Sequence, residues 1–179
     1  MDVKFNNTQL EIIKAKNYQT ILDNVKPNVV CAFITSNHYP VDRSSAELIN
    51  SCDSLIKIKK NLKEGGYTST GKFYWLKEKN NVSVLISVGK RFGAVATQVN
   101  MNDLKGVLEN IAIEMRLAGY KTIVIPLISF KIARFNSEVF FNSLESIFYG
   151  MHIVIATHLD HSKRRDGRLY REIPDLCVK

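Results

Sequence analysis

Hydrophobic positions along the chain follow two spacings, one typical of buried strands and one typical of amphipathic helices. Residues 10–15, 28–34, 122–128 and 152–157 are short, largely apolar runs. Segment 28–34 is rich in β-branched and aromatic side chains, which is typical of a strand covered on both faces. These four segments are therefore predicted to be strands of one sheet.

Two further strands are predicted to form a hairpin. Residues 72–76 and 82–88 are largely apolar, and the polar stretch 77–81 separates them. Pro126 has no amide hydrogen to donate, so it is expected at the end of its strand or on an edge of the sheet.

Three segments have the i, i+3, i+4 spacing of helices that bury one face. The first spans residues 44–64, starts with a Ser-x-x-Glu capping box and ends at a Gly-Gly pair. The second starts at residue 102 or 103 and ends before Gly119, and the third spans residues 137–149. A short turn or helix is expected near residues 18–23.

The resulting order, β-β-α-β-β-α-β-α-β, predicts an α/β fold. Strands that alternate with helices through short connections favour a three-layer α/β/α sandwich around a central mixed sheet. Ligands of such sheets bind outside the carboxyl ends of the strands. The segments after Ile34, Val88, Ile128 and Thr157 are therefore the places to look for a site.

Composition fits one folded domain. The chain has 179 residues, 45 % of them hydrophobic, which excludes disorder as the main state. We expect one domain over residues 1–160, followed by a basic tail over 161–179. Three cysteines far apart exclude a disulfide scaffold and suit a reducing compartment. No apolar run approaches the roughly 20 residues that span a bilayer, and no signal-peptide pattern opens the chain. A cytoplasmic location without membrane contact is expected, in the host cytoplasm if the chain is viral.

The net charge of +8 favours an anionic partner. Nucleic acid, a nucleotide and a phosphorylated metabolite all fit a basic protein, and a solvated basic surface is the alternative.

Small polar residues follow the strand 28–34. Asn37 carries both a donor and an acceptor, so it is able to bind a pair of sugar hydroxyls. The alternative interpretation is that Asn37 only forms a turn, as Asn often does.

The segment after residue 128 has the composition of a phosphate cradle. A strand, a loop with cations and a helix N-terminus combine charge with backbone N–H groups. This loop has no glycine, although backbone that approaches phosphate closely usually needs one. Its candidate ligand-binding residues are Ser129, Phe130, Lys131 and Arg134.

Familiar catalytic and cofactor motifs are missing. The chain has no Walker A, G-x-G-x-x-G or G-x-S-x-G pattern, so no cofactor is predicted. His158, Asp160 and His161 have no further ligands at a suitable spacing, so a polar strand end is favoured over a metal site. Cys31 and Cys52 fall on apolar faces and are predicted to be core residues.

The basic tail is a candidate for contact with nucleic acid. Arginine suits phosphate, and Tyr170 is able to stack on a base. The alternative is a solvated terminus. The tail residues assigned to phosphate contact are Lys163, Arg164, Arg165 and Arg168.

Four segments together resemble the macro domain, an ADP-ribose-binding module. They are Lys16-Asn17-Tyr18, the strand 30–37 that ends in an asparagine, the turn 65–71, and the helix-Gly-strand 118–128 with its Ile-Pro. The chain is most similar to the branch with ADP-ribose-1''-phosphate phosphatases and their phage relatives, over residues 10–157. The resemblance implies that Asn37 binds the distal ribose. It also implies that Asn17 stands where the family has an acid that holds the adenine amino group.

The chain departs from the family at both phosphate loops. The glycine-rich loop that wraps the diphosphate falls on residues 41–47, which contain no glycine, and the second loop falls on 129–134. Arg43, Lys131 and Arg134 are able to replace backbone contacts with charge.

Three hypotheses remain open at this point. The first is a site for ADP-ribose or a related small nucleotide, either binding or hydrolytic, with His38 or Asp42 as the catalytic group that moves protons. The second is a nucleic-acid-binding module that uses the tail and the lysine-rich helix at 55–63. The third is a structural or protein-interaction module that kept the fold and lost the ligand. The sequence separates neither a binder from a hydrolase nor one oligomeric state from another.

Overall fold

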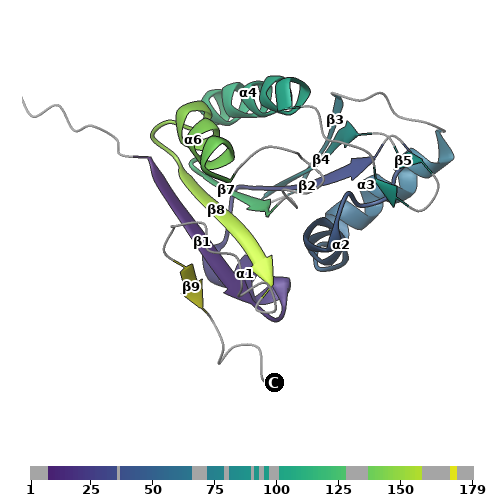
Figure 1. The fold of residues 1–179 in the computed structure, drawn as a ribbon, viewed down its shortest axis with the longest axis horizontal. Helices are drawn as coiled ribbons and strands as arrows, with labels where there is room; N and C mark the ends of the chain where they lie inside the picture. Colours follow the sequence, from purple (N-terminus) through teal and green to yellow (C-terminus); the bar gives the residue numbers. More distant parts are fainter. Residues whose placement is uncertain are drawn as a thin grey trace, which may run out of the picture.

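A seven-stranded sheet with helices on both faces forms the described part of the computed structural model (Figure 1). The described residues are 8–35, 37–65, 72–78, 81–89, 91–92, 95–96, 101–127, 137–158 and 170–172. The strands of the sheet are β1 (Gln9–Ala15), β2 (Val29–Thr35), β3 (Lys72–Lys77), β4 (Val82–Gly89), β7 (Thr122–Pro126), β8 (His152–His158) and β9 (Tyr170–Glu172). A separate two-stranded sheet joins β5 (Arg91–Phe92) to β6 (Val95–Ala96). The described helices are α1 (Tyr18–Val25), α2 (Arg43–Asn50), α3 (Asp53–Glu64), α4 (Met101–Ala118) and α6 (Ser137–Ile147).

The sheet is mixed, as the hydrophobic pattern predicts. Its strand order is β3-β4-β2-β7-β8-β1-β9. β3 pairs antiparallel with β4 and forms the predicted hairpin, while the other neighbouring strands are parallel. Every residue of β2 is buried, which confirms that its continuous apolar run marks a strand covered on both faces.

Two hydrophobic clusters, one on each face of the sheet, make the three layers. α4 and α6 pack on one face, where Phe33, Ile111 and Phe140 belong to one cluster. α1, α2 and α3 pack on the other face, where Ile34, Leu48 and Leu55 belong to the second (Figure 1). The α/β/α sandwich is therefore confirmed. Within the described ranges, no helix has the length and apolar character needed to cross a membrane.

The helix predicted over residues 44–64 is two helices. α2 ends at Ser51, whose hydroxyl donates to the carbonyl of Glu47 at 2.8 Å, and α3 begins after Cys52. Both helices bury their apolar side against the same face of the sheet, so the hydrophobic spacing continues across the break. Asp42 caps α2 in place of the predicted Ser44, because its side chain accepts a hydrogen bond from the amide of Ser45 at 3.0 Å.

A strand at the edge of the sheet comes from the segment expected to be a tail. β9 pairs parallel with β1, with Ile12 opposite Tyr170 and Lys14 opposite Glu172. Residues 161–169 and 173–179 lie outside the described residues, so the division of the chain at residue 160 stays a prediction.

Candidate functional site

The topology singles out the carboxyl ends of β2 and β7 as the position to examine for a site. These two parallel strands are neighbours, but the chain continues from β2 to α2 on one face and from β7 to α6 on the other. Neighbouring strands whose connections leave in opposite directions create the usual binding crevice of an open α/β sheet. The segment after β2 therefore forms one wall of the candidate site.

The predicted phosphate loop after β7 lies outside the described residues, and so do the four basic residues of the tail. Their assignments as ligand contacts stay predictions. These residues are Ser129, Phe130, Lys131, Arg134, Lys163, Arg164, Arg165 and Arg168. Residues 159–161, which include two of the three metal candidates, are also outside. In the part of the chain that the structure describes, no group of three His, Cys, Asp or Glu side chains is placed to hold a metal ion.

The hydroxyl of Thr35, at the end of β2, organises the loop that follows. It donates to the side-chain oxygen of Asn37 at 2.7 Å and accepts from the amide of Tyr39 at 3.2 Å. The backbone closes the same turn, because the amide of Thr35 donates to the carbonyl of Tyr39 at 2.7 Å. Asn37 is half-buried. Its oxygen is already bonded to Thr35, so the N–H donors of its amide remain for a ligand.

His38 occupies a strained position in this turn. Its φ is 69°, in the left-handed region that residues other than glycine seldom adopt. The side chain is buried, and its Nε2 atom has no hydrogen-bond partner. Burial lowers the pKa of the imidazole, and the ammonium groups of Lys63 and Lys59 lower it further.

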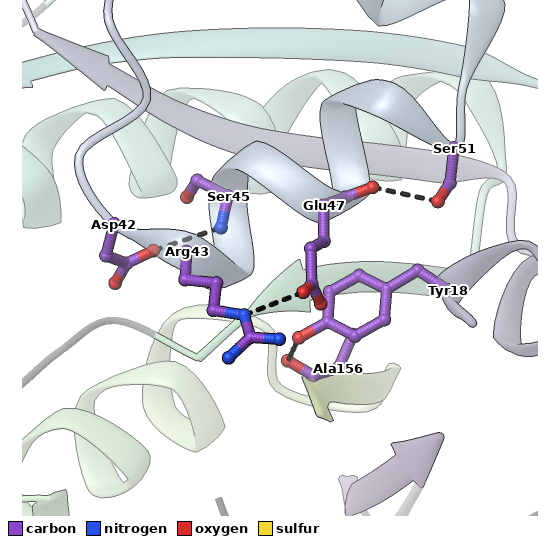
Figure 2. Close-up of polar contacts among 7 residues, drawn as sticks. All are labelled: Tyr18, Asp42, Arg43, Ser45, Glu47, Ser51 and Ala156. Carbon is purple, nitrogen blue, oxygen red and sulfur yellow. Dashed lines mark hydrogen bonds and ion pairs between the residues drawn. The ribbon is translucent and has the colours of Figure 1, made fainter. Parts of the chain in front are cut away.

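The start of α2 gathers three charged side chains (Figure 2). Asp42 points back to the amide of Ser45 as the helix cap. Arg43 donates through Nε to Glu47 Oε1 at 2.9 Å, an i, i+4 pair on the outside of the helix. The other oxygen of Glu47, Oε2, is buried without a partner. The side chain of Arg43 is 60 % exposed, so it is accessible to a ligand.

Tyr18, at the start of α1, lies against the carboxyl end of β8 and the first turns of α2 (Figure 2). Its hydroxyl lies 3.5 Å from the carbonyl of Ala156, and the neighbouring groups include Ser44 and Glu47. Burial raises the pKa of this phenol well above its usual range. Tyr18 is therefore a neutral, buried structural contact. Asn17, the residue before it, caps α1 by accepting from the amide of Gln19 at 2.9 Å.

Three buried side-chain atoms of the described residues have no hydrogen-bond partner: His38 Nε2, Glu47 Oε2 and Thr157 Oγ1. His38 and Glu47 belong to the loop and the helix that follow β2, and Thr157 lies near the carboxyl end of β8. Buried polar atoms are nearly always hydrogen-bonded, so unpaired ones call for an explanation. Their shared location at the carboxyl edge of the sheet marks this edge as the candidate site.

Four predicted site residues lie within six positions of one another at this edge, namely Asn37, His38, Asp42 and Arg43. Sequence reasoning assigned no role in the site to Thr35, Glu47 or Thr157. The sequence pattern indicates Glu47 only as a capping residue. Thr157 ends one of the predicted strands. The rule that ligands bind outside the carboxyl ends of strands, called the strand-end rule below, is the one sequence signal that points to it.

A cavity of about 640 Å³ lies away from these residues. It is bounded by the end of α1, the junction of α2 and α3 and the β3–β4 turn, with Asp23, Lys26, Ser54 and Glu78 among its lining. None of the predicted site residues lines it. The candidate site is placed at the carboxyl edge, because the three unpaired buried polar atoms of the described residues lie there.

Comparison with solved structures places this architecture among known folds. The macrodomain of Thermus aquaticus DarG superposes with a TM-score of 0.59 at 8 % identity, covering 84 % of this chain and 99 % of that one. The macrodomain of Mycobacterium tuberculosis DarG gives 0.61 at 10 % identity, covering 81 % and 96 %. Thermosipho africanus DarTG, solved in complex with ADP-ribose, gives 0.59 at 11 % identity over 84 % of this chain and 40 % of that one.

No protein-family model matches the chain, and no curated protein matches it in sequence. The likeness is therefore one of structure. At this level of identity it concerns the arrangement of the elements and leaves the ligand open. By that arrangement, the chain has the macrodomain fold.

Proposed function

We propose that the chain binds ADP-ribose or a closely related nucleotide at the carboxyl edge of β2 and β7. The observation that carries this proposal is the way Thr35 holds Asn37. The carboxamide is fixed through its oxygen at 2.7 Å, at the end of a central strand, with its N–H donors remaining for a ligand. A structural relative, the Thermosipho africanus protein, was solved with ADP-ribose bound, which supports this choice of ligand.

In this proposal Asn37 donates to hydroxyls of the distal ribose. A side chain that is already oriented loses little entropy on binding, which favours affinity. Arg43 faces the diphosphate from the start of α2, where a planar guanidinium suits phosphate oxygens. Its ion pair with Glu47 is exposed and therefore weak enough to rearrange when a ligand arrives.

Asn17 is proposed to contact the adenine. Its side-chain oxygen already accepts from the amide of Gln19, so the side-chain N–H group is what remains for the base. An asparagine that donates here prefers a ring-nitrogen acceptor to an amino group. We therefore expect Asn17 to distinguish adenine from bases that lack the amino group less strongly than a carboxylate at this position would.

We further propose that the chain hydrolyses the bound ligand. The sequence predicts His38 or Asp42 as the group that transfers protons, and both residues lie between β2 and α2. Asp42 is already engaged as a helix cap, and the lowered pKa of His38 favours a neutral imidazole that can accept a proton. His38 is thus the better candidate for a general base, and a hydrolase assay tests both roles.

The test of binding is a calorimetric titration with ADP-ribose, with AMP as the comparison ligand. We expect a dissociation constant in the micromolar range, about −8 kcal/mol. Asn37→Ala should weaken binding by about tenfold or more, because it removes the oriented donors at the ribose. Asn50→Ala, which changes an exposed asparagine at the end of α2, the helix that follows this loop, is the matched control. A flat titration of the wild type, or equal affinity of the Asn37→Ala variant, contradicts the proposal.

A further inference from the structure

Exposed hydrophobic side chains gather on the layer formed by α4 and α6. Six large hydrophobic side chains of the described residues are exposed, and four of them belong to this layer: Ile113, Leu117, Val139 and Tyr149. Leu117 is 79 % exposed and Ile113 is 53 % exposed, and they are neighbours one turn apart on α4. The two helices lie together on one face of the sheet (Figure 1). Single exposed apolar side chains are ordinary, whereas a group of them on one layer is typical of a protein–protein contact surface.

Two hollows and one hydrogen bond join these side chains into a continuous surface. A groove of about 370 Å³ lies between α4 and α6, with Glu109 and Val139 in its lining. A second hollow of about 340 Å³ lies at the C-terminal ends of the two helices, with Arg116 and Tyr149 in its lining. Arg116 donates through Nη2 to the carbonyl of Ile147, the last residue of α6, at 2.9 Å. The term α4–α6 surface is used below for the residues Glu109, Ile113, Arg116, Leu117, Val139 and Tyr149.

The charges of the α4–α6 surface are complementary to those of a second copy. Glu109 precedes Ile113 by four residues and Arg116 follows it by three, so the three side chains lie on one side of α4. Glu109 is exposed and forms no ion pair with another described residue. When two α4 helices pack antiparallel about a two-fold axis at Ile113, Glu109 of each copy meets Arg116 of the other. In a parallel arrangement like charges would face each other, so the charges favour the antiparallel one.

We propose that the α4–α6 surface is the interface of a symmetric dimer of this chain, with the two α4 helices antiparallel. Ile113 and Leu117 of both copies form its apolar centre, and two pairs of Glu109 with Arg116 of the partner subunit flank that centre. Arg116 keeps its bond to Ile147 and has further N–H groups for a carboxylate. A second copy is the occupant that fits, because this one surface carries both halves of the charge pattern, as a two-fold interface requires.

This dimer is independent of the proposed ADP-ribose binding. α1 and α2, which carry Asn17 and Arg43 at their starts, pack on the face of the sheet opposite to α4 and α6. The α4–α6 surface includes none of the predicted site residues. Association therefore leaves α1 and α2 uncovered, and a variant that abolishes the dimer should bind ADP-ribose with unchanged affinity.

The test is sedimentation-velocity ultracentrifugation of the full chain under reducing conditions, over a range of concentrations. We expect a monomer–dimer equilibrium with a dissociation constant in the micromolar range. Leu117→Asp should weaken association by about tenfold or more, because it places two carboxylates at the apolar centre of the interface. Ile56→Asp is the matched control, since Ile56 is also an exposed aliphatic residue but lies on α3, on the opposite face of the sheet. Its effect on association should stay below about twofold.

Charge variants test the antiparallel arrangement of the two helices. Glu109→Arg and Arg116→Glu each place like charges opposite one another at both ends of the centre, so each protein alone should dimerise about tenfold more weakly. When the two variants are mixed in equal amounts, the heterodimer again joins opposite charges in both pairs. The mixture should therefore associate to within about threefold of the wild type. This recovery also shows that neither variant has lost its fold.

Three results overturn the proposal. The first is a wild type that remains monomeric at about 300 μM, which would leave the α4–α6 surface to a different partner. The second is a Leu117→Asp protein that dimerises as tightly as the Ile56→Asp control. The third is a mixture of the two charge variants that associates no better than either protein alone. None of these measurements involves ADP-ribose, so a failure of the dimer is distinguishable from a failure of the proposed function.

Discussion

Thr35 and Asn37 are joined by a side-chain hydrogen bond of 2.7 Å at the carboxyl end of β2. The same Thr35 hydroxyl accepts from the amide of Tyr39, so one buried atom fixes both the proposed ribose-binding side chain and the loop that carries it.

Replacing this hydroxyl should damage both stability and binding. Thr35→Val keeps the shape but leaves the amide of Tyr39 without its partner, which costs about 1–3 kcal/mol of unfolding free energy. The affinity for ADP-ribose should fall about tenfold, because Asn37 loses its fixed orientation. Thr35→Ser restores the hydroxyl and should recover most of both. Denaturant unfolding and calorimetry measure the two effects, and an unchanged affinity in the valine variant contradicts the proposed role.

Two variants of Asp42 show whether this residue is a structural cap, a catalytic group or both. Asp42→Ala removes the cap of α2 and should cost about 1 kcal/mol of stability. Asp42→Asn keeps a good capping side chain but has no carboxylate to move protons. If Asp42 acts in hydrolysis, the asparagine variant should retain stability and lose turnover of the ligand. Full turnover by that variant limits Asp42 to capping.

His38 should make stability depend on pH in one direction. Its pKa is lowered in the folded chain, so below its unfolded value of about 6.5 the unfolded chain binds the proton more readily. The stability contributed by the neutral imidazole is therefore complete above that pH and is lost as the pH falls through the lowered folded pKa. His38→Gln should flatten this loss between about pH 7.5 and pH 5 in denaturant unfolding. An identical pH dependence in both proteins contradicts the prediction.

Two glycines with open space around them should respond in opposite directions to alanine. Gly119 follows the last residue of α4 with a φ of +74°. A side chain there is strained by this backbone conformation, although its Cβ would meet no neighbouring atom within 4 Å. Gly119→Ala should therefore cost about 1 kcal/mol. Gly106 lies inside α4, and a Cβ added there would also meet no neighbouring atom within 4 Å. Gly106→Ala should therefore stabilise the chain by up to about 1 kcal/mol. Thermal and denaturant unfolding of both variants provide the comparison.

Much of the fold followed from local pattern. The continuous apolar run before Thr35, the hairpin and the stop at Gly119 are all present as predicted. The break between α2 and α3 was missed because both helices bury the same face, so the spacing of apolar residues gives no sign of it. β9 was also missed. Three residues that complete the edge of a sheet have no hydrophobic period to detect.

The candidate site was predictable to a smaller extent. The strand-end rule selected Asn37 and its neighbours, because the carboxyl ends of parallel strands share one edge. It said nothing of the Thr35 hydroxyl, whose role depends on the chain folding back at Tyr39. It also said nothing of Lys59, which follows His38 by twenty-one positions and acts on it from a different element.

The sequence by itself predicted most of the order of strands and helices, the face that each buries and the edge of the sheet at which we propose that a ligand binds. These properties depend on hydrophobic spacing within a few residues, which the linear chain contains in full. Only the tertiary structure decided which polar groups are paired and which are left without a partner. Pairing depends on distances of about 3 Å between groups on separate elements, and those distances exist only once the sheet and its helices are packed.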